Sequence, residues 1–160
     1  MGEIKIIEDI LAPSDTLKVK FTGNNPYAAV AMAQDLLKSV MKITTKDTLE
    51  TTVMWDVTGK VPSFYGKWMG KRPEDVWSKT LIRLIIQGEQ NSQDKTGWVE
   101  VRIKGTIETE YEYSNFIQRG FWWFFNSVFY HNQRRKYLDF AKDNMYQIRD
   151  KLKQTFELEE

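Results

Sequence analysis

The segment 98–113 alternates between apolar and charged side chains along its length, and this pattern is the strongest constraint in the sequence. One side carries Val99, Val101, Ile103, Ile107 and Tyr111, and the other carries Glu100, Arg102, Lys104, Glu108 and Glu110. A period of two with one charged face is typical of an antiparallel strand covered on a single side. We therefore expect a long strand here, with a bend or bulge at Gly105.

From about Asn115 to Phe156 the apolar period changes from that of a strand to that of a helix. The apolar residues then recur at intervals of three and four: Ile117, Phe121, Phe124 and Val128, and later Leu138, Ala141, Met145, Ile148 and Leu152. Such spacing places side chains on one face of a helix. It predicts a long C-terminal helix that covers the sheet, with Ser114 as a candidate N-cap.

Shorter elements precede these two. Alternation predicts strands near 4–6, 17–21, 48–57, 64–70 and 76–88, and turns at 12–15, 58–60 and 72–75. The alanine-rich stretch that ends near Lys42 predicts a helix, with Asn25 as N-cap and Pro26 in the first turn. The order of elements predicts an α+β fold in one domain, 1–160. In it, a curved antiparallel sheet wraps a long C-terminal helix, and a shorter helix follows an early strand.

Composition excludes most classes of catalytic site. The chain has 160 residues, no cysteine and one histidine, His131. Thiolate zinc sites, cysteine nucleophiles and histidine-rich metal sites are therefore excluded. The sequence also lacks a dinucleotide-binding glycine fingerprint, a phosphate-binding P-loop and a nucleophile elbow. It consequently predicts neither a metal site nor a cofactor, and it identifies no catalytic residue.

The charge balance and the N-terminus bear on partners and location. The 23 basic and 22 acidic residues give a net charge of +1, whereas nucleic-acid binders usually carry a basic excess on one face. This disfavours a nucleic-acid partner. The N-terminal segment has neither the layout of a signal peptide nor a hydroxyl residue at Ile6 for myristoylation. A cytoplasmic location is the expectation.

The order of elements resembles that of the START-like superfamily, also called helix-grip or SRPBCC. The residues that carry the likeness are the strand Leu17–Phe21, the helix opened by Asn25-Pro26-Tyr27, the following long strands and the terminal helix, over about 15–156. No sequence motif contributes. The resemblance implies a curved sheet around the C-terminal helix, with lipids, sterols, polyketides or other apolar molecules held between them. The apolar stretch Ile4–Leu11 and the length of the terminal helix depart from the family pattern.

The segment 120–130 is apolar around its whole circumference, in a chain that has six tryptophans. It is shorter than the about 20 residues that span a bilayer. Three interpretations remain open: a helix buried on several sides, a homodimer or partner interface, and transient insertion into a membrane surface beside Arg134 to Lys136.

Two groups of residues are candidates for binding a ligand. Continuing the spacing of Phe121, Phe124 and Val128 places His131 and Arg135 on the inner helix face, where they would hold a polar head group. A buried cation costs several kcal/mol unless it is paired, so the alternatives are that Arg134 to Lys136 are solvated or that the helix bends at Asn132. Aromatic residues on the inner faces of the strands form the second group. They would either line a ligand pocket or simply pack in the core. The full candidate set is Trp55, Trp68, Tyr111, Tyr113, Phe121, Phe124, Phe125, Val128, His131 and Arg135.

These patterns support three functions. The first is a non-enzymatic carrier that holds an apolar or amphipathic small molecule between sheet and helix. The second is an interaction protein with a filled core, whose segment 120–130 contacts a second copy or another protein. The third is a cyclase or hydratase, which would need His131 or a buried acid facing a cavity.

Overall fold

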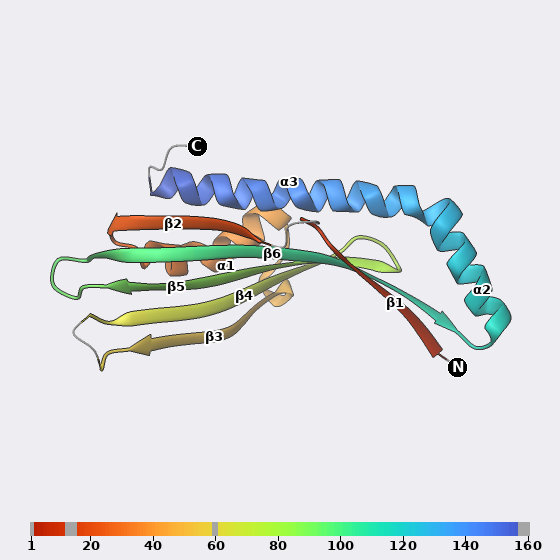
Figure 1. The fold of residues 1–160 in the computed structure, drawn as a ribbon, viewed down its shortest axis with the longest axis horizontal. Coiled ribbons are helices and arrows are strands. Elements are labelled where there is room, and N and C mark those ends of the chain that lie inside the picture. The colour runs from red at the N-terminus through yellow and green to blue at the C-terminus, as the bar shows by residue number, and fades with distance from the viewer. Residues whose placement is uncertain (1, 12–15, 59–60, 157–160) are drawn as a thin grey trace.

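In the part of the chain that the structure describes, six antiparallel strands form one open sheet (Figure 1). The computed structural model describes residues 2–11, 16–58 and 61–156. The strands are β1 (Gly2–Asp9), β2 (Leu17–Asn24), β3 (Thr48–Asp56), β4 (Ser63–Pro73), β5 (Ser78–Gln90) and β6 (Thr96–Tyr113). Strands β3 to β6 lie in sequence order, and both β1 and β2 pair with β6.

The long strand β6 carries two partners end to end along one edge. Its residues 96–103 pair with β2 and its residues 106–113 pair with β1. The stretch Ile4–Leu11, which departs from the START-like pattern, thus supplies the strand beside the second half of β6. On the opposite edge, β6 pairs with β5 without any shift of register through Gly105. The predicted bulge at Gly105 is therefore wrong.

Gly105 instead lies in close contact with side chains of Ile10 and of the helix. A Cβ atom at this position would lie 2.7 Å from Cδ1 of Ile10 and 2.8 Å from Sδ of Met145. Both distances are below van der Waals contact, so a larger residue would require these two side chains to shift. The Ile10 N–H also donates to the Gly105 carbonyl at 3.0 Å.

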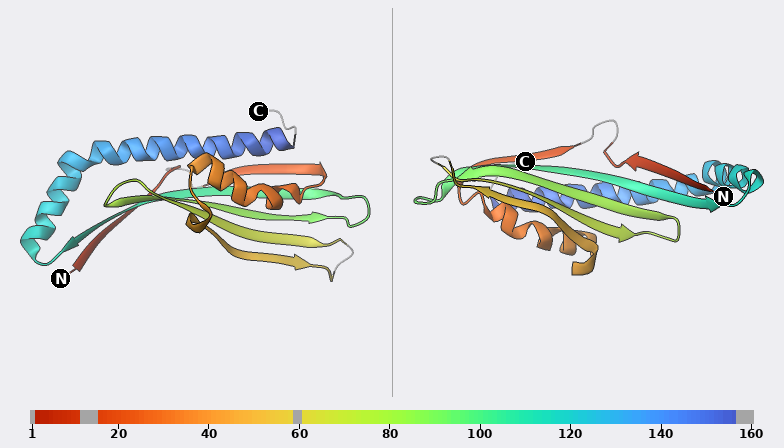
Figure 2. Two further views of the ribbon diagram at one scale, coloured as in Figure 1. Left: turned by 180° about the vertical axis from the view of Figure 1, so that it is seen from behind. Right: turned by 90° about the horizontal axis from the view of Figure 1, so that it is seen from below.

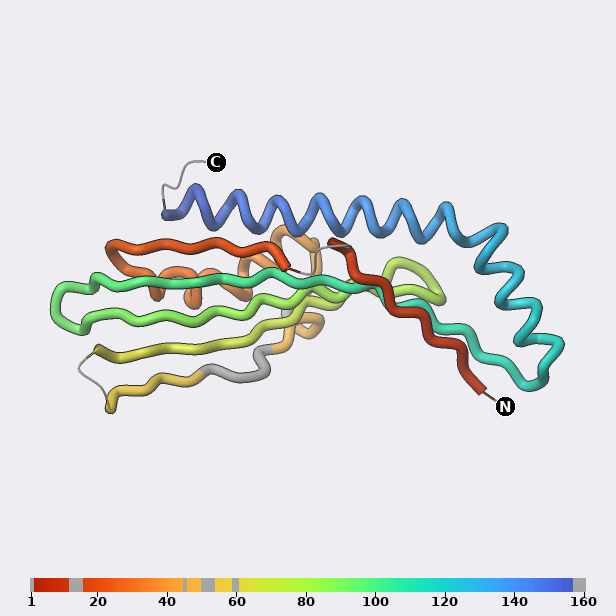
Figure 3. The backbone as a smooth tube through the Cα atoms, viewed as in Figure 1, coloured from red at the N-terminus to blue at the C-terminus, as the bar shows by residue number. Residues whose placement is uncertain are grey.

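The C-terminal helical region consists of two straight helices joined by a π-helical turn. These are α2 (Phe116–Phe125), the turn Asn126–Tyr130 and α3 (His131–Thr155). At the turn the chain changes direction, so that α2 projects away from the line of α3 (Figures 1 and 3). We call residues 116–130 the arm. The predicted helix is confirmed, but it bends at Asn126–Tyr130 rather than at Asn132.

Helices α1 (Ala28–Met41) and α3 cover the same face of the sheet (Figure 2). The core between these helices and the sheet is fully buried, as expected where the apolar stripe of a helix packs on the apolar face of a sheet. From α3 it takes Ala141, Met145, Ile148 and Leu152, and from the sheet Ile82, Leu84, Ile86, Val101, Ile103 and Ile107. The predicted α+β class, with an antiparallel sheet and a long C-terminal helix, is confirmed.

Helix α1 begins differently from the prediction. Asn25 has a φ of 52°, in the left-handed region, and the N-cap position is Tyr27, which makes no side-chain capping bond. The prediction that Asn25 caps this helix is therefore wrong. At the other end Lys42 is left-handed, and the Lys38 carbonyl accepts both from the Lys42 N–H and from the Ile43 N–H, the latter at 3.1 Å, which closes the last turn.

Some strand limits also differ. Strand β4 continues to Pro73, where a turn was expected, and the Glu74 N–H donates to the Ser78 carbonyl at 2.9 Å to form the turn. Val76 lies in that turn and is 91% exposed, because β5 begins at Ser78 rather than at residue 76 as predicted. The predicted turn at 12–15 lies outside the described residues, and so do residues 59 and 60 of the turn predicted at 58–60.

Arg72 connects strand β4 to both helices. Its Nε donates to Glu74 at 2.8 Å, and its Nη1 donates to the Met41 carbonyl at 3.2 Å and to Oδ1 of Asn144 at 2.8 Å. Glu74 also accepts from the Thr80 hydroxyl at 2.7 Å. The ion pair with Glu74 orients the guanidinium, and the charge-assisted hydrogen bond to Asn144 links it to α3.

Candidate functional site

The arm begins with a hydrogen-bonded cap. The Asn115 side chain accepts from the Gln118 backbone N–H at 2.9 Å, and Oε1 of Gln118 accepts from the Ser114 N–H at 2.7 Å. This reciprocal arrangement satisfies free donors at a helix N-terminus. The N-cap is thus Asn115, one residue after the predicted Ser114.

An aromatic cluster lies between the inner side of the arm and the far end of the sheet. Tyr111 stacks on Trp122 with ring centroids 4.7 Å apart, and Trp77 lies 5.4 Å from Phe125 and 5.5 Å from Tyr130. The Trp122 indole N–H donates to the Glu112 carbonyl at 2.8 Å. Offset and edge-on ring pairs of this kind each add to the burial energy. They hold the arm against β6.

Away from the aromatic cluster, the arm is exposed and apolar around much of its circumference. Its large side chains have these exposed fractions: Phe116 82%, Ile117 71%, Phe121 58%, Trp123 45%, Phe124 57%, Val128 54% and Phe129 65%. We call these seven residues the arm surface. In the arm segment Phe116–Tyr130, Arg119 is the one charged residue. An apolar patch of this kind on a folded chain usually marks a contact site.

The cation that enters the interior is Arg134, not Arg135. Arg134 is 3% exposed and donates to Glu8 at 3.1 Å, to the Thr109 hydroxyl at 3.3 Å and to Oδ1 of Asn126. His131 and Arg135 are both exposed, so the prediction that they lie on the inner helix face is wrong. The prediction extended the stripe of Phe121, Phe124 and Val128, and these three side chains are themselves exposed. On the regular winding of α3 it is Arg134, seven residues before the buried Ala141, that lies on the buried face.

Asp75 connects the arm to the turn between β4 and β5. Its Oδ2 accepts from the hydroxyls of Tyr130 at 2.5 Å and Tyr137 at 2.9 Å, and its Oδ1 accepts from the backbone N–H groups of Trp77 and Ser78, both at 2.8 Å. Partial burial raises the pKa of this carboxyl. The hydrogen bonds, with that of Tyr130 foremost, outweigh the burial, and the pKa of Asp75 lies below its ordinary value of 3.8.

The pKa values of the two tyrosines that donate to Asp75, Tyr130 and Tyr137, are shifted upward. Burial raises the pKa of Tyr130 well above its ordinary value, and its hydrogen bond to Asp75 raises it further. Burial also raises the pKa of Tyr137. Both phenols therefore remain protonated donors to an ionised Asp75 at neutral pH.

The lowered pKa of Asp75 predicts a loss of stability in acid. A carboxyl with a lower pKa in the folded state stabilises the fold above its unfolded pKa, near 3.8, and this contribution disappears as the pH falls through the folded value. We expect the free energy of unfolding of Asp75→Asn to fall less steeply than that of the wild type below about pH 4. Urea unfolding at pH values from 7 to 2.5 measures both curves, and parallel curves would contradict the assignment.

The remaining predicted site residues do not form one pocket. Trp68 is 4% exposed in the core under α1, whereas Tyr111 is 1% exposed in the separate aromatic cluster with Tyr113 and Phe125 beside it. Trp55 is 45% exposed and lies 4.8 Å from the Tyr27 ring. Of the two alternatives left open for the strand aromatics, pocket or core, Trp68 and Tyr111 are core residues, and they belong to two separate clusters.

His131 and Arg135 do share a surface pocket of about 240 Å³ between α3 and the end of β1. Glu8, Asp9 and Asp139 line it together with Arg134 and Lys142, so its charges are mixed. The described residues contain no group of three or more metal-ligating His, Cys, Asp or Glu side chains. In the same residues no helix is both long and apolar enough to cross a membrane.

Sequence reasoning missed Asp75, Trp77, Tyr130 and Arg134. A carboxylate in a turn and a single arginine beside another arginine carry no periodic signal that would distinguish them. Asn126 gave a signal that was available: it is a polar side chain inside an aromatic run, and it accepts from Arg134 and from the Tyr111 hydroxyl.

Comparisons with known proteins give little further information. No protein-family model matches this chain, and no curated protein matches it. A structure of a protein of unknown function from Staphylococcus aureus is 10% identical, covers 95% of this chain and 98% of its own, and has a TM-score of 0.25. An uncharacterised protein from Rhizobium leguminosarum is 8% identical, with coverages of 92% and 99% and a TM-score of 0.24. Similarity at this level carries no argument about function.

Proposed function

We propose that this protein is an interaction protein that forms a homodimer through the arm surface. The observation that supports this is the exposure of seven large apolar side chains on one projecting segment. Aromatic side chains are enriched in the cores of protein interfaces, and monomers rarely expose a contiguous group of them. The aromatic cluster on the inner side of the arm fixes the arm to the sheet, so that these seven side chains are held in place.

Magnitudes favour association. Full burial of a side chain of this size contributes about 1.5–3 kcal/mol. These side chains are 45–82% exposed, and if all seven became buried in both copies they would together contribute on the order of 10–20 kcal/mol. Association costs roughly 4–15 kcal/mol in lost translational and rotational freedom. The arm surface is therefore large enough to carry a dimer.

A protein partner suits this surface better than a membrane does. Helices that lie in a membrane interface usually carry a lysine- and arginine-rich polar face next to the apolar one. Here the inner side of the arm is occupied by the aromatic cluster, and the arm contains Arg119 as its one charge. Anionic lipid would gain little electrostatic attraction from such a segment.

The test of this function is a double substitution on the arm. Phe121→Glu with Phe124→Glu places two charges within the arm surface, one helical turn apart. We expect a wild-type dimer in sedimentation velocity at micromolar concentration and a folded monomer for the double variant, because each buried charge would be unpaired.

The matched control is Gln147→Glu with Gln154→Glu, which adds the same charge at exposed positions of α3. It should leave the dimer intact. A wild-type chain that stays monomeric, or an arm variant that still dimerises, would overturn the proposal.

A carrier of apolar molecules is the second candidate. The element order, with an open antiparallel sheet and a long C-terminal helix, is compatible with the helix-grip architecture of START-like proteins. The aromatic cluster under the arm favours a carrier, since movement of the arm at the π-helical turn would open an apolar space there. Native mass spectrometry distinguishes the two candidates: a monomer with a co-purified small molecule supports the carrier, and a ligand-free dimer supports the interaction protein.

A further inference from the structure

Strand β1 has one unpaired edge, and the backbone register shows which residues face it. The Ile10 N–H bonds to Gly105, which continues the register that pairs Asp9 with Thr106. In an antiparallel ladder, backbone groups alternate between the partner strand and the opposite edge. Even-numbered residues of β1 therefore bond to β6. The backbone groups of Glu3, Lys5, Ile7 and Asp9 point away from it.

These groups have no backbone partner within the described part of the chain. An unpaired strand edge of this kind readily accepts another strand, and proteins usually protect it with proline, a bulge or a covering element. Strand β1 contains no proline, and its pairing with β6 has no shift of register. Ile7 on this strand is 56% exposed.

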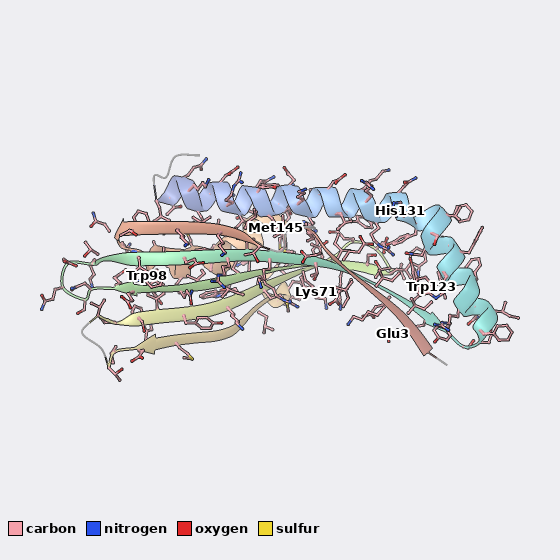
Figure 4. The ribbon with its side chains drawn as sticks, in the orientation of Figure 1. Glu3, Lys71, Trp98, Trp123, His131 and Met145 are labelled. Carbon is pink, nitrogen blue, oxygen red and sulfur yellow. The ribbon has the colours of Figure 1, made fainter. Side chains whose placement is uncertain are left out.

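A groove lies along this edge, between β1 and the arm. It has a volume of about 690 Å³ and is open to solvent, and residues 5–8 line one side, while Trp123, Ser127 and His131 line the other. Figure 4 shows Trp123 and His131 on the helical side and Glu3 on β1. A strand that enters the groove would form backbone bonds with β1 and place its side chains against Trp123, which is 45% exposed.

We propose that the occupant of this groove is strand β1 of a second copy of the chain, antiparallel and centred on Ile7. This inference rests on the proposed homodimer and names the contact that sets its geometry. A two-fold axis at Ile7 makes the interface self-complementary, as a symmetric dimer requires. The two sheets then form one continuous sheet across the interface, and the arm of each copy covers strand β1 of the other.

Charge and strand overlap together select this register. Because the outward backbone groups belong to odd-numbered residues, odd residues must lie opposite odd residues. Centring on Ile7 places Lys5 opposite Asp9 of the second copy, twice, with Ile7 opposite Ile7 between them. Centring one residue earlier would oppose Glu3 and Asp9, and centring on Lys5 would oppose two lysines; like charges directly opposite are destabilising. Centring on Ile4 would oppose Glu3 and Lys5, but only residues 2–6 of β1 would then pair, so fewer backbone hydrogen bonds form.

The first test removes the edge without removing the strand. Ile7→Pro deletes an N–H that faces away from β6, and proline is tolerated where the N–H of an edge strand faces solvent. We expect the dimer Kd to rise at least about tenfold, because central backbone hydrogen bonds are lost. The melting temperature of the diluted monomer should change little.

The second test exchanges charges within one chain. Lys5→Asp alone and Asp9→Lys alone each create two like-charge pairs, and we expect each to raise the dimer Kd about tenfold. The variant with both substitutions restores opposite charges and should return to within about threefold of the wild-type Kd. Lys5 is also 3.8 Å from Glu108 and Glu110. The double variant also loses this contact of Lys5 with the two glutamates. A recovered dimer Kd would therefore result from the restored pairing between the two strands and not from the contact within one chain.

The outcomes separate this inference from the proposed function. If the arm variant dissociates while Ile7→Pro dimerises normally, the strand pairing is wrong and the homodimer through the arm stands. If Ile7→Pro dissociates while the arm variant dimerises, the strand pairing stands and the arm contact is wrong. Failure of the charge-exchange variant to recover overturns the register, and a monomeric wild type overturns both proposals.

Discussion

Ile148→Ala should lower the free energy of unfolding by about 2–5 kcal/mol, the range for truncating a buried side chain to alanine. Ile148 is 0% exposed and belongs to the main core cluster between α3 and the sheet. Its removal would leave a cavity that the neighbouring strands close only in part, because the antiparallel ladder holds them in place. For a chain of this size the melting temperature should fall by roughly 5–15 °C.

Two variants make this result specific. Ile148→Val removes one methyl group and should cost about 0.5–1.5 kcal/mol. Gln147→Ala changes the adjacent exposed residue of the same helix and should stay within about 0.5 kcal/mol of the wild type. Urea unfolding followed by circular dichroism measures all three. Equal losses for Ile148→Ala and Gln147→Ala would show that α3 does not pack on the sheet through this face.

Arg134→Met should destabilise the fold by about 2–3 kcal/mol, whereas Arg135→Met should change it by less than about 0.5 kcal/mol. The methionine keeps much of the apolar volume but leaves Thr109, Asn126 and Glu8 without their charged partner. Removing one member of a buried ion pair can cost about 3–5 kcal/mol. The Glu8 side chain is 37% exposed and can return to water, so we expect the lower value.

The comparison of adjacent arginines controls for charge and for helix propensity, because both variants lose one positive charge from neighbouring positions of α3. The free energy of unfolding from urea titrations at pH 7 is the measurement. If Arg135→Met proved the more damaging change, the buried cation would be Arg135, and the stripe of Phe121, Phe124 and Val128 would continue onto the buried face as predicted.

The prediction that Arg135 rather than Arg134 is buried failed because the apolar pattern of the preceding segment does not indicate which side faces the sheet. Periodicity correctly placed Ala141, Met145, Ile148 and Leu152 on the buried face, because that stretch has a polar face to contrast with the apolar one. The segment 120–130 has no such contrast, so the stripe through Phe121 and Phe124 looked as suitable as the one through Trp122 and Phe125. The second stripe is the one that packs in the aromatic cluster with Ile4 and Tyr111 of the sheet.

The candidate interaction surface was predictable in composition but not in orientation. The aromatic run was recognised as an interface, a membrane contact or a buried helix, and it proves to be buried on one side and exposed on the other. The groove beside β1 was not predictable at all. It depends on β1 and β2 pairing with different halves of β6, which leaves an edge beside the arm.

The amino-acid sequence by itself determined the antiparallel sheet and the two helical regions, because periods of two and of three to four reflect which side of each element meets water. Tertiary structure alone decided that the terminal helix bends at Asn126–Tyr130 and which of its aromatic side chains remain exposed. An apolar side chain gains about the same free energy on any surface that removes it from water. Its pattern therefore records that it is buried somewhere, while shape and packing select the partner.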